Sequence, residues 1–185
     1  PILSVEQAEA FVDKYGKPGD VIEFFGGEPT LHFESMQHIM KKYPDYVYRI
    51  YSNGNFDSSV RDSDLWLQFD EVLISMDGPF ELNQMRTPNR VHYNHIIDNI
   101  KYLVEAGVEV GIGIAIPNSK SYSNLQDTVD YFYGLGIRYF SFEPITVVND
   151  DNPKGITLKN MEHLVKACVN IANVFFMDGE RVLFN

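Results

Sequence analysis

Hydrophobic residues along the chain alternate between short runs rich in β-branched and aromatic residues and longer stretches with helical spacing. The short runs predict strands at residues 21–25, 46–51, 71–76, 108–116 and 137–142. The longer stretches predict helices at residues 4–16, 32–42, 63–69, 93–106, 125–135 and 158–176. This alternation predicts right-handed β-α-β crossovers and therefore a parallel sheet.

The first predicted helix has clear start and stop signals. Ser4 and Gln7 form a capping-box pattern, and Gly16 follows the last helical residue. The apolar residues predicted to share its buried face are Val5, Ala8, Phe11 and Val12. Because a helix in a parallel β/α array follows a strand, we expect one further strand upstream of Pro1.

The predicted elements form one α/β domain over residues 1–185. Helices outside a parallel sheet fit either a barrel segment or a doubly wound sheet. Since a complete eight-stranded barrel needs about 250 residues, we predict a partial (β/α)6 TIM-like barrel. We expect this domain to be truncated at both ends, with its first strand absent from the sequence. The polar segment at residues 147–155 is expected to be a solvated loop.

The charge balance excludes several kinds of partner. The net charge is −11, from 26 acidic and 15 basic residues, and no cluster of Lys or Arg offers a basic face for nucleic acid or an anionic membrane. The sequence contains neither an apolar run of membrane-spanning length nor an N-terminal signal pattern, so we expect a cytoplasmic protein. Small molecules, peptides and proteins remain as partners.

The chain contains one cysteine, Cys168, so no intrachain disulfide is possible. It lies in a stretch with helical apolar spacing, which predicts a buried, inert thiol rather than a metal ligand. We therefore predict no metal site built from this sequence.

The most unusual residues follow the predicted strands, at the edge where parallel β/α folds bind ligands. After the first predicted strand, Gly26 and Gly27 free the backbone to adopt unusual dihedral angles and let a ligand approach without meeting a Cβ. Glu28 adds a negative charge there, and such a corner suits a primary amine. The alternative is an ordinary Gly-Gly turn beside a surface glutamate.

Three such segments together resemble the radical S-adenosylmethionine (SAM) enzymes. Gly-Gly-Glu-Pro-Thr-Leu at residues 26–31 is similar to the motif that holds the amino group of SAM in that family. Tyr-Ser-Asn-Gly at residues 51–54 and Ile-Ser-Met-Asp-Gly-Pro at residues 74–79 are similar to its next two strand-end motifs, in the same order. The branch most resembled modifies peptides and proteins and includes the sulfatase-maturating enzymes and SPASM-type maturases.

The resemblance implies a set of contacts. The residues implied to bind SAM are Gly26, Gly27, Glu28, Pro29, Ser52, Asn53, Ser75, Arg86 and Ile116. Asp77 and Glu143 are implied as substrate contacts, and no catalytic residue is assigned. Three of these assignments have alternatives: Asn53 as part of a left-handed turn, Asp77 as a turn former, and Arg86 as half of a surface ion pair. Arg90 competes with Arg86 for its role, and Asn83-Gln84 stand where the branch often has His-Asp.

The family also binds a [4Fe–4S] cluster through a Cys-x-x-x-Cys-x-x-Cys loop after its first strand, and these cysteines are absent here. We expect that loop upstream of Pro1, and we expect the 185 residues alone to be inactive. The resemblance implies that the parent enzyme cleaves SAM to a 5′-deoxyadenosyl radical, acts on a peptide or protein, and receives electrons from a flavodoxin or ferredoxin. The alternatives are a small-metabolite radical SAM enzyme and a non-catalytic partial barrel that binds SAM or peptide.

Overall fold

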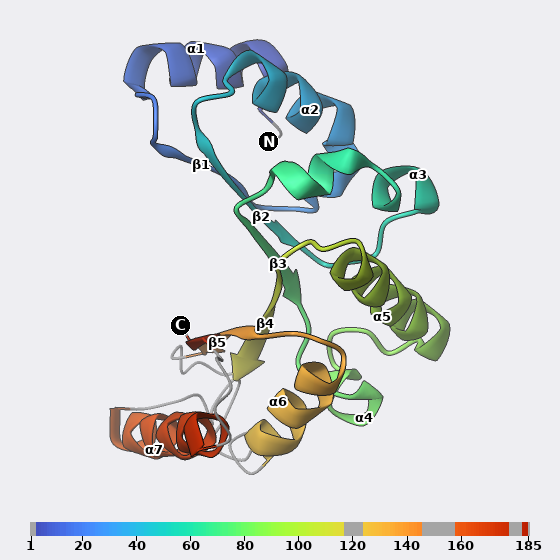
Figure 1. Cartoon of the computed structure of the whole chain (residues 1–185), viewed down its shortest axis with the longest axis vertical. Coiled ribbons are helices and arrows are strands. Elements are labelled where there is room, and N and C mark those ends of the chain that lie inside the picture. The colour runs from blue at the N-terminus through green and yellow to red at the C-terminus, as the bar shows by residue number, and fades with distance from the viewer. Residues whose placement is uncertain (1–2, 117–123, 146–157, 178–182, 185) are drawn as a thin grey trace, which may run out of the picture.

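The computed structural model describes residues 3–116, 124–145, 158–177 and 183–184 (Figure 1). Its strands form one parallel sheet in the order β1-β2-β3-β4-β5-β6. They are β1 (Val21–Phe24), β2 (Val47–Ser52), β3 (Glu71–Ser75), β4 (Val110–Ile116), β5 (Tyr139–Pro144) and β6 (Leu183–Phe184). The five predicted strands are confirmed, whereas β6 was not predicted.

The order of the strands decides between the two predicted architectures. A doubly wound sheet reverses its strand order at a switch point, but here each strand lies beside the next one in sequence. Right-handed crossovers that all run in one direction place their helices on the same face of the sheet. Figure 1 shows α2, α3, α5 and α6 following one another along one side of the curved sheet. This is the arrangement of a partial barrel.

The helices largely match the predicted pattern. They are α1 (Val5–Tyr15), α2 (Phe33–Lys42), α3 (Ser58–Arg61), α4 (Phe80–Asn83), α5 (Arg90–Glu105), α6 (Leu125–Gly134) and α7 (Leu158–Met177), with 3-10 helices η1 (Pro29–His32) and η2 (Asp64–Gln68). The short helices α3 and α4 were not predicted. Helix α5 begins earlier than predicted because the Asn89 side chain accepts hydrogen bonds from the backbone N–H groups of Val91 and His92.

Helix α1 confirms its predicted caps and corrects one predicted core residue. The Ser4 and Gln7 side chains form the capping box, and the backbone N–H of Gly16 donates to Val12. Val12 is buried, but Phe11 is 62% exposed. Neighbouring helical residues lie about 100° apart around the axis, so the burial of Val12 does not bury Phe11 beside it.

The core lies between the helices and one face of the sheet. Alternate residues of the central strands fill it, and those with no exposed surface are Ile50, Val72, Ile74, Ile112 and Phe140. Leu73 also has no exposed surface but lies on the opposite face of β3. Helix α7 adds Leu164 and Ile171 to this core, and Cys168 packs at its margin. Among the described residues, no helix has the length and apolar character needed to cross a bilayer. The predicted polar loop at residues 147–155 lies outside the described residues.

Candidate functional site

The carboxyl ends of the parallel strands bring the predicted site residues to one edge of the sheet. Gly26, Gly27, Glu28 and Pro29 follow β1, Ser52 ends β2 with Asn53 after it, and Ser75 ends β3. Ile116 and Glu143 lie at the ends of β4 and β5. Three segments far apart in sequence therefore share one edge, as predicted.

The two glycines after β1 form an exposed backbone corner. Gly26 has φ +90° and Gly27 has φ +56°, values that L side chains rarely adopt. A Cβ built on either residue would have no other atom within 4 Å. A side chain at either position would therefore not clash with the rest of the protein. Because glycine has no Cβ, the backbone here is open to an approaching ligand.

The carboxylate of Glu28 joins the ends of β1 and β2. Its Oε1 accepts from the Thr30 hydroxyl at 2.7 Å and from the Ser52 hydroxyl at 2.9 Å. Its Oε2 accepts from the backbone N–H of Asn53 at 2.7 Å. Because a carboxylate oxygen accepts up to two good hydrogen bonds, Oε2 keeps a free lone pair. Glu28 thus fixes the Gly-Gly corner against β2 while retaining some capacity for a donor.

Asn53 shapes the turn after β2 in a different way from the left-handed turn considered above. No non-glycine residue in the described part of the chain has a positive φ, so Asn53 does not adopt that conformation and Gly54 does, with φ +75°. The Asn53 Oδ1 accepts from the backbone N–H of Asn55 at 2.7 Å. Its side-chain oxygen therefore stabilises the turn, and its Nδ2 group remains for a ligand.

Asp77 and Arg86 form a two-pronged ion pair. Arg86 donates from Nε to one Asp77 oxygen at 3.1 Å and from Nη2 to the other at 3.0 Å. Asp77 Oδ1 also accepts from the backbone N–H of Ala115 at 3.0 Å, which attaches this loop to β4. The ion-pair alternative thus describes what the structure shows for Arg86, whereas the Asp77 carboxylate binds Arg86 and β4 and, among the described residues, makes no hydrogen bond within a turn of its own. Arg90 instead pairs with Glu81 on the exposed surface.

Three other predicted contacts lie at this edge with different surroundings. Ser75 is half-buried, and its hydroxyl makes no hydrogen bond within the described residues. Ile116 is buried, and its carbonyl accepts from the backbone N–H of Ile145 at 3.0 Å. Glu143 is exposed on the sheet face that the helices do not cover. Pro117, which follows Ile116 in the sequence, lies outside the described residues.

Polar residues on the sheet face that the described helices do not cover, called the uncovered face below, were missed by the sequence analysis. Strand register places Arg49 between Glu23 and Glu71, and its Nε lies 3.1 Å from Oε2 of Glu71. Tyr51 lies one layer further toward the carboxyl ends. Burial, followed by the nearby carboxylates of Glu23 and Glu71, raises the pKa of Tyr51. Alternating polar residues in the second strand carried a signal for this face.

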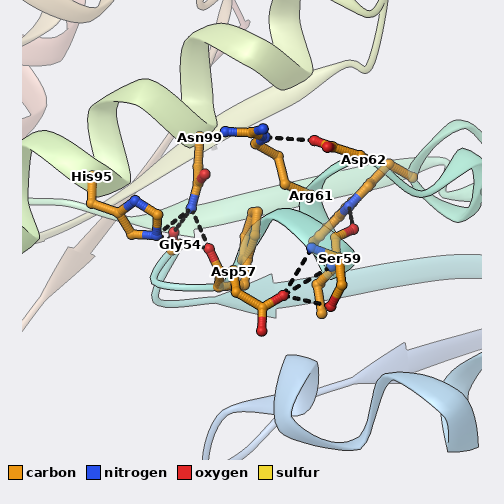
Figure 2. Close-up of polar contacts among 10 residues, drawn as sticks. Gly54, Asp57, Ser59, Arg61, Asp62, His95 and Asn99 are labelled. Carbon is orange, nitrogen blue, oxygen red and sulfur yellow. Dashed lines mark hydrogen bonds and ion pairs between the residues drawn. The ribbon is translucent and has the colours of Figure 1, made fainter.

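A second group of polar contacts supports the turn after β2 from the helix side. In Figure 2, the buried Asn99 side chain on α5 donates to the carbonyls of Gly54 and Phe56, both at 2.9 Å. His95, one turn earlier, lies 2.9 Å from the same Phe56 carbonyl and therefore donates from Nε2. An open groove of about 500 Å³ lies beside this group, lined by residues of η1, the turn after β2, α3 and α5.

The residues at the edge fit SAM better than they fit an iron–sulfur cluster. Gly26 and Gly27 offer an open backbone, Glu28 offers a free lone pair and Ser75 offers a free hydroxyl, a donor and acceptor set suited to an amino acid and a ribose. The only cysteine, Cys168, is half-buried on α7, and burial raises its thiol pKa. A cluster held by three thiolates therefore cannot be ligated by these 185 residues.

Comparison with known proteins places this geometry in context. No protein-family model and no curated protein matches the sequence. The solved structure of anSMEcpe with bound AdoMet and Cp18Cys peptide matches with a TM-score of 0.81 and 20% identity, over 100% of this chain and 56% of that chain. SuiB of Streptococcus suis bound to S-adenosylmethionine matches with a TM-score of 0.71 and 18% identity, over 89% of this chain and 39% of that chain.

A third match comes from a domain of pyruvate-formate lyase-activating enzyme from Bacteroides vulgatus. Its TM-score is 0.61 at 16% identity, and the match covers 90% of this chain and 99% of that domain. The chain thus spans about half the length of anSMEcpe and less of SuiB. At this level of identity the likeness establishes the fold, and the chain has the partial-barrel fold of the radical SAM enzymes, as its strand-end motifs predicted.

Proposed function

We propose that this chain is the SAM-binding core of a radical SAM enzyme that modifies a peptide or protein. The observation that carries the proposal is the meeting of three separate motifs at one sheet edge, where Glu28 joins two of them by hydrogen bonds. The bound AdoMet and Cp18Cys peptide of anSMEcpe support the choice of cofactor and substrate class.

Each residue at the edge has a specific part in this proposal. The open backbone at Gly26 and Gly27 and the spare lone pair of Glu28 accept the amino group of SAM. Ser75 and the Nδ2 group of Asn53 bind its hydroxyl or carboxylate oxygens. Arg86 uses two of its nitrogens on Asp77, so Nη1 is the one left to donate to SAM. Ile116 lies at the end of β4 to frame the adenine.

SAM supplies the chemistry when it is reduced, by giving a 5′-deoxyadenosyl radical that abstracts hydrogen from the substrate. Reduction requires a [4Fe–4S] cluster and an electron donor such as a flavodoxin or ferredoxin. Since this chain has one cysteine, the cluster ligands must come from residues outside these 185. The part that we propose for this chain is to bind and orient SAM and the substrate.

The test is SAM cleavage by the product of the complete gene. After anaerobic reconstitution with iron and sulfide and reduction by dithionite, we expect 5′-deoxyadenosine to form, and its formation to increase with the peptide substrate. A gene without a Cys-x-x-x-Cys-x-x-Cys segment would overturn the proposal. A reconstituted cluster that yields no 5′-deoxyadenosine would overturn it as well, and would favour a non-catalytic partial barrel that binds SAM or peptide.

A further inference from the structure

The side chains of β5 divide between the two faces of the sheet. Phe140 belongs to the core under the helices, so Tyr139, Ser141 and Glu143 alternate onto the opposite, uncovered face. Their partners in β4 are Gly111, Gly113 and Ala115, in that order. The uncovered face of β4 therefore carries no side chain larger than a methyl group.

The small residues of β4 form a floor over which the side chains of β5 lie. A Cβ on Gly111 would overlap the ring of Tyr139, so the ring occupies the space above this glycine. A Cβ on Gly113 would lie 3.6 Å from Oε1 of Glu143. The carboxylate of Glu143 therefore lies against the sheet, level with the end of β4, instead of extending away from it.

Ser141 lies between these two residues on the same face of the sheet. Its exposed fraction is 8%, and the hydroxyl makes no hydrogen bond in the part of the chain that the structure describes. The buried side-chain atoms without a partner among the described residues are Arg49 Nε, Asn83 Nδ2 and Asn99 Oδ1, so the Ser141 hydroxyl oxygen keeps exposed surface on which a ligand could bind. Because Ser141 is flanked by the Tyr139 ring and the Glu143 carboxylate, a ligand that hydrogen-bonds to its hydroxyl would lie above the β4 floor.

Glu143 differs from the other acidic residues near this edge in having no internal partner. Glu28 is held by neutral donors and Asp77 by Arg86, whereas the Glu143 carboxylate has no ion pair or hydrogen bond among the described residues. Among the described strand residues whose side chains lie on this face, Arg49 is the only cation, and it lies between Glu23 and Glu71. The uncovered face therefore has a negative potential, which favours a cationic ligand at Glu143.

We propose that Glu143 and Ser141 form a subsite for a primary ammonium group, the side chain of a substrate lysine, above the glycine floor of β4. This inference rests on the proposed function, because it names the residue type that the peptide presents beside SAM. The carboxylate supplies the opposite charge, the Ser141 hydroxyl accepts one N–H, and the Tyr139 ring covers the lysine methylenes.

The test compares three capped tripeptides, acetyl-Gly-Xaa-Gly-amide with lysine, norleucine or arginine at Xaa, in titrations of the 15N-labelled chain followed by NMR. Norleucine matches most of the lysine side chain and lacks the charge. We expect the lysine peptide to bind at least tenfold more tightly than the norleucine peptide and to shift the amide signals of Ser141 and Glu143. Equal affinities of these two peptides would overturn the proposal, as would tighter binding of the arginine peptide.

Variants separate the subsite from general charge effects. Glu143→Gln should abolish the preference for lysine over norleucine, and Ser141→Ala should reduce it about threefold. Glu162→Gln, on the exposed surface of α7, is the matched control and should preserve the preference. A preference that survives Glu143→Gln would contradict the proposal, as would a Glu143→Gln variant that loses SAM affinity while it still prefers lysine.

The outcome is distinguishable from that of the proposed function. If the complete gene product forms 5′-deoxyadenosine but the chain shows no preference for lysine, this subsite is wrong and the proposed function stands. If no 5′-deoxyadenosine forms but the preference for lysine depends on Glu143, the subsite stands as part of a peptide-binding barrel.

Discussion

The Ser52 hydroxyl donates a hydrogen bond to the Glu28 carboxylate at 2.9 Å across 24 residues of sequence, and this contact joins the ends of β1 and β2. The same carboxylate accepts from the backbone N–H groups of Thr30 and Asn53. One side chain therefore holds together two of the motifs that we assign to SAM binding.

This relationship predicts that Glu28→Gln destabilises the fold. The amide keeps the shape of the side chain but turns one acceptor into a donor that faces other donors, and hydrogen bonds to a charged group are stronger than neutral ones. We expect a loss of about 2 kcal/mol in the free energy of unfolding, measured by urea denaturation. The control is Glu105→Gln at the exposed end of α5, and equal stabilities of the two variants would contradict the assigned role of Glu28.

The ion pair between Asp77 and Arg86 should contribute more than the one between Glu81 and Arg90. The Asp77 and Arg86 side chains are 19% and 33% exposed, against 69% and 61% for Glu81 and Arg90. In double-mutant cycles with alanine, we expect a coupling free energy of about 1 kcal/mol for the first pair and below about 0.3 kcal/mol for the second. The reverse order would show that the two-pronged contact does not fix the loop after β3.

Gly111→Ala should destabilise the sheet, whereas Gly134→Ala should not. A Cβ on Gly111 would overlap the Tyr139 ring and lie 2.9 Å from Cδ1 of Leu73, so the ring must move. We expect a loss of about 1 to 3 kcal/mol. Gly134, in α6, has no atom within 4 Å of a built Cβ, so alanine there should add about 0.5 to 1 kcal/mol. Thermal denaturation of both variants measures the difference.

The stability of the fold should fall at alkaline pH partly through Tyr48. Burial raises the pKa of its phenol to about 12, and the hydroxyl donates to the Tyr43 carbonyl at 2.6 Å. A raised pKa means that the folded state favours the neutral phenol. The stability that Tyr48 contributes through its raised pKa is therefore complete below the unfolded-state pKa of about 10. It is lost as the pH rises from there toward the folded-state pKa.

The check is the pH dependence of the free energy of unfolding between pH 9 and 11. Tyr48→Phe should lower stability at pH 9 because it loses the hydrogen bond, but its stability should decline less steeply above pH 10. Tyr15→Phe, which removes an exposed phenol, is the control and should follow the wild-type slope. Parallel curves for Tyr48→Phe and the wild type would show that this phenol is not the cause.

The sequence predicted the sheet edge well because strand-end motifs depend on local signals. Glycines and an asparagine after β-rich runs indicate where strands end, and parallel topology brings those ends together. The hydrogen-bond or ion-pair partner of each side chain could not be predicted in this way. The pairing of Asp77 with Arg86 depends on how α4 directs the chain, and a helix of four residues has almost no sequence periodicity.

The uncovered face of the sheet was predictable in part. Arg49 and Tyr51 alternate with buried residues along β2. Tyr139, Ser141 and Glu143 alternate with Phe140 and Phe142 along β5, which is a two-residue period within a parallel sheet. A sheet buried on both faces would instead show continuous hydrophobic runs. The position of Glu143 over Gly113 required the register of β4 and β5, which no local pattern contains.

The central claim is that the open backbone corner at Gly26 binds SAM, and the most direct measurement is the SAM affinity of Gly26→Ala in the reconstituted product of the complete gene. Gly107→Ala is the matched control, because Gly107 has φ +85° against +90° for Gly26 and a Cβ built on either residue has no other atom within 4 Å. Gly107 precedes β4, so it lies at the opposite edge of the sheet from the proposed SAM site. We predict that both variants lose similar thermal stability, that Gly26→Ala binds SAM at least tenfold more weakly, and that Gly107→Ala binds it as the wild type does. Wild-type SAM affinity in Gly26→Ala would contradict the claim.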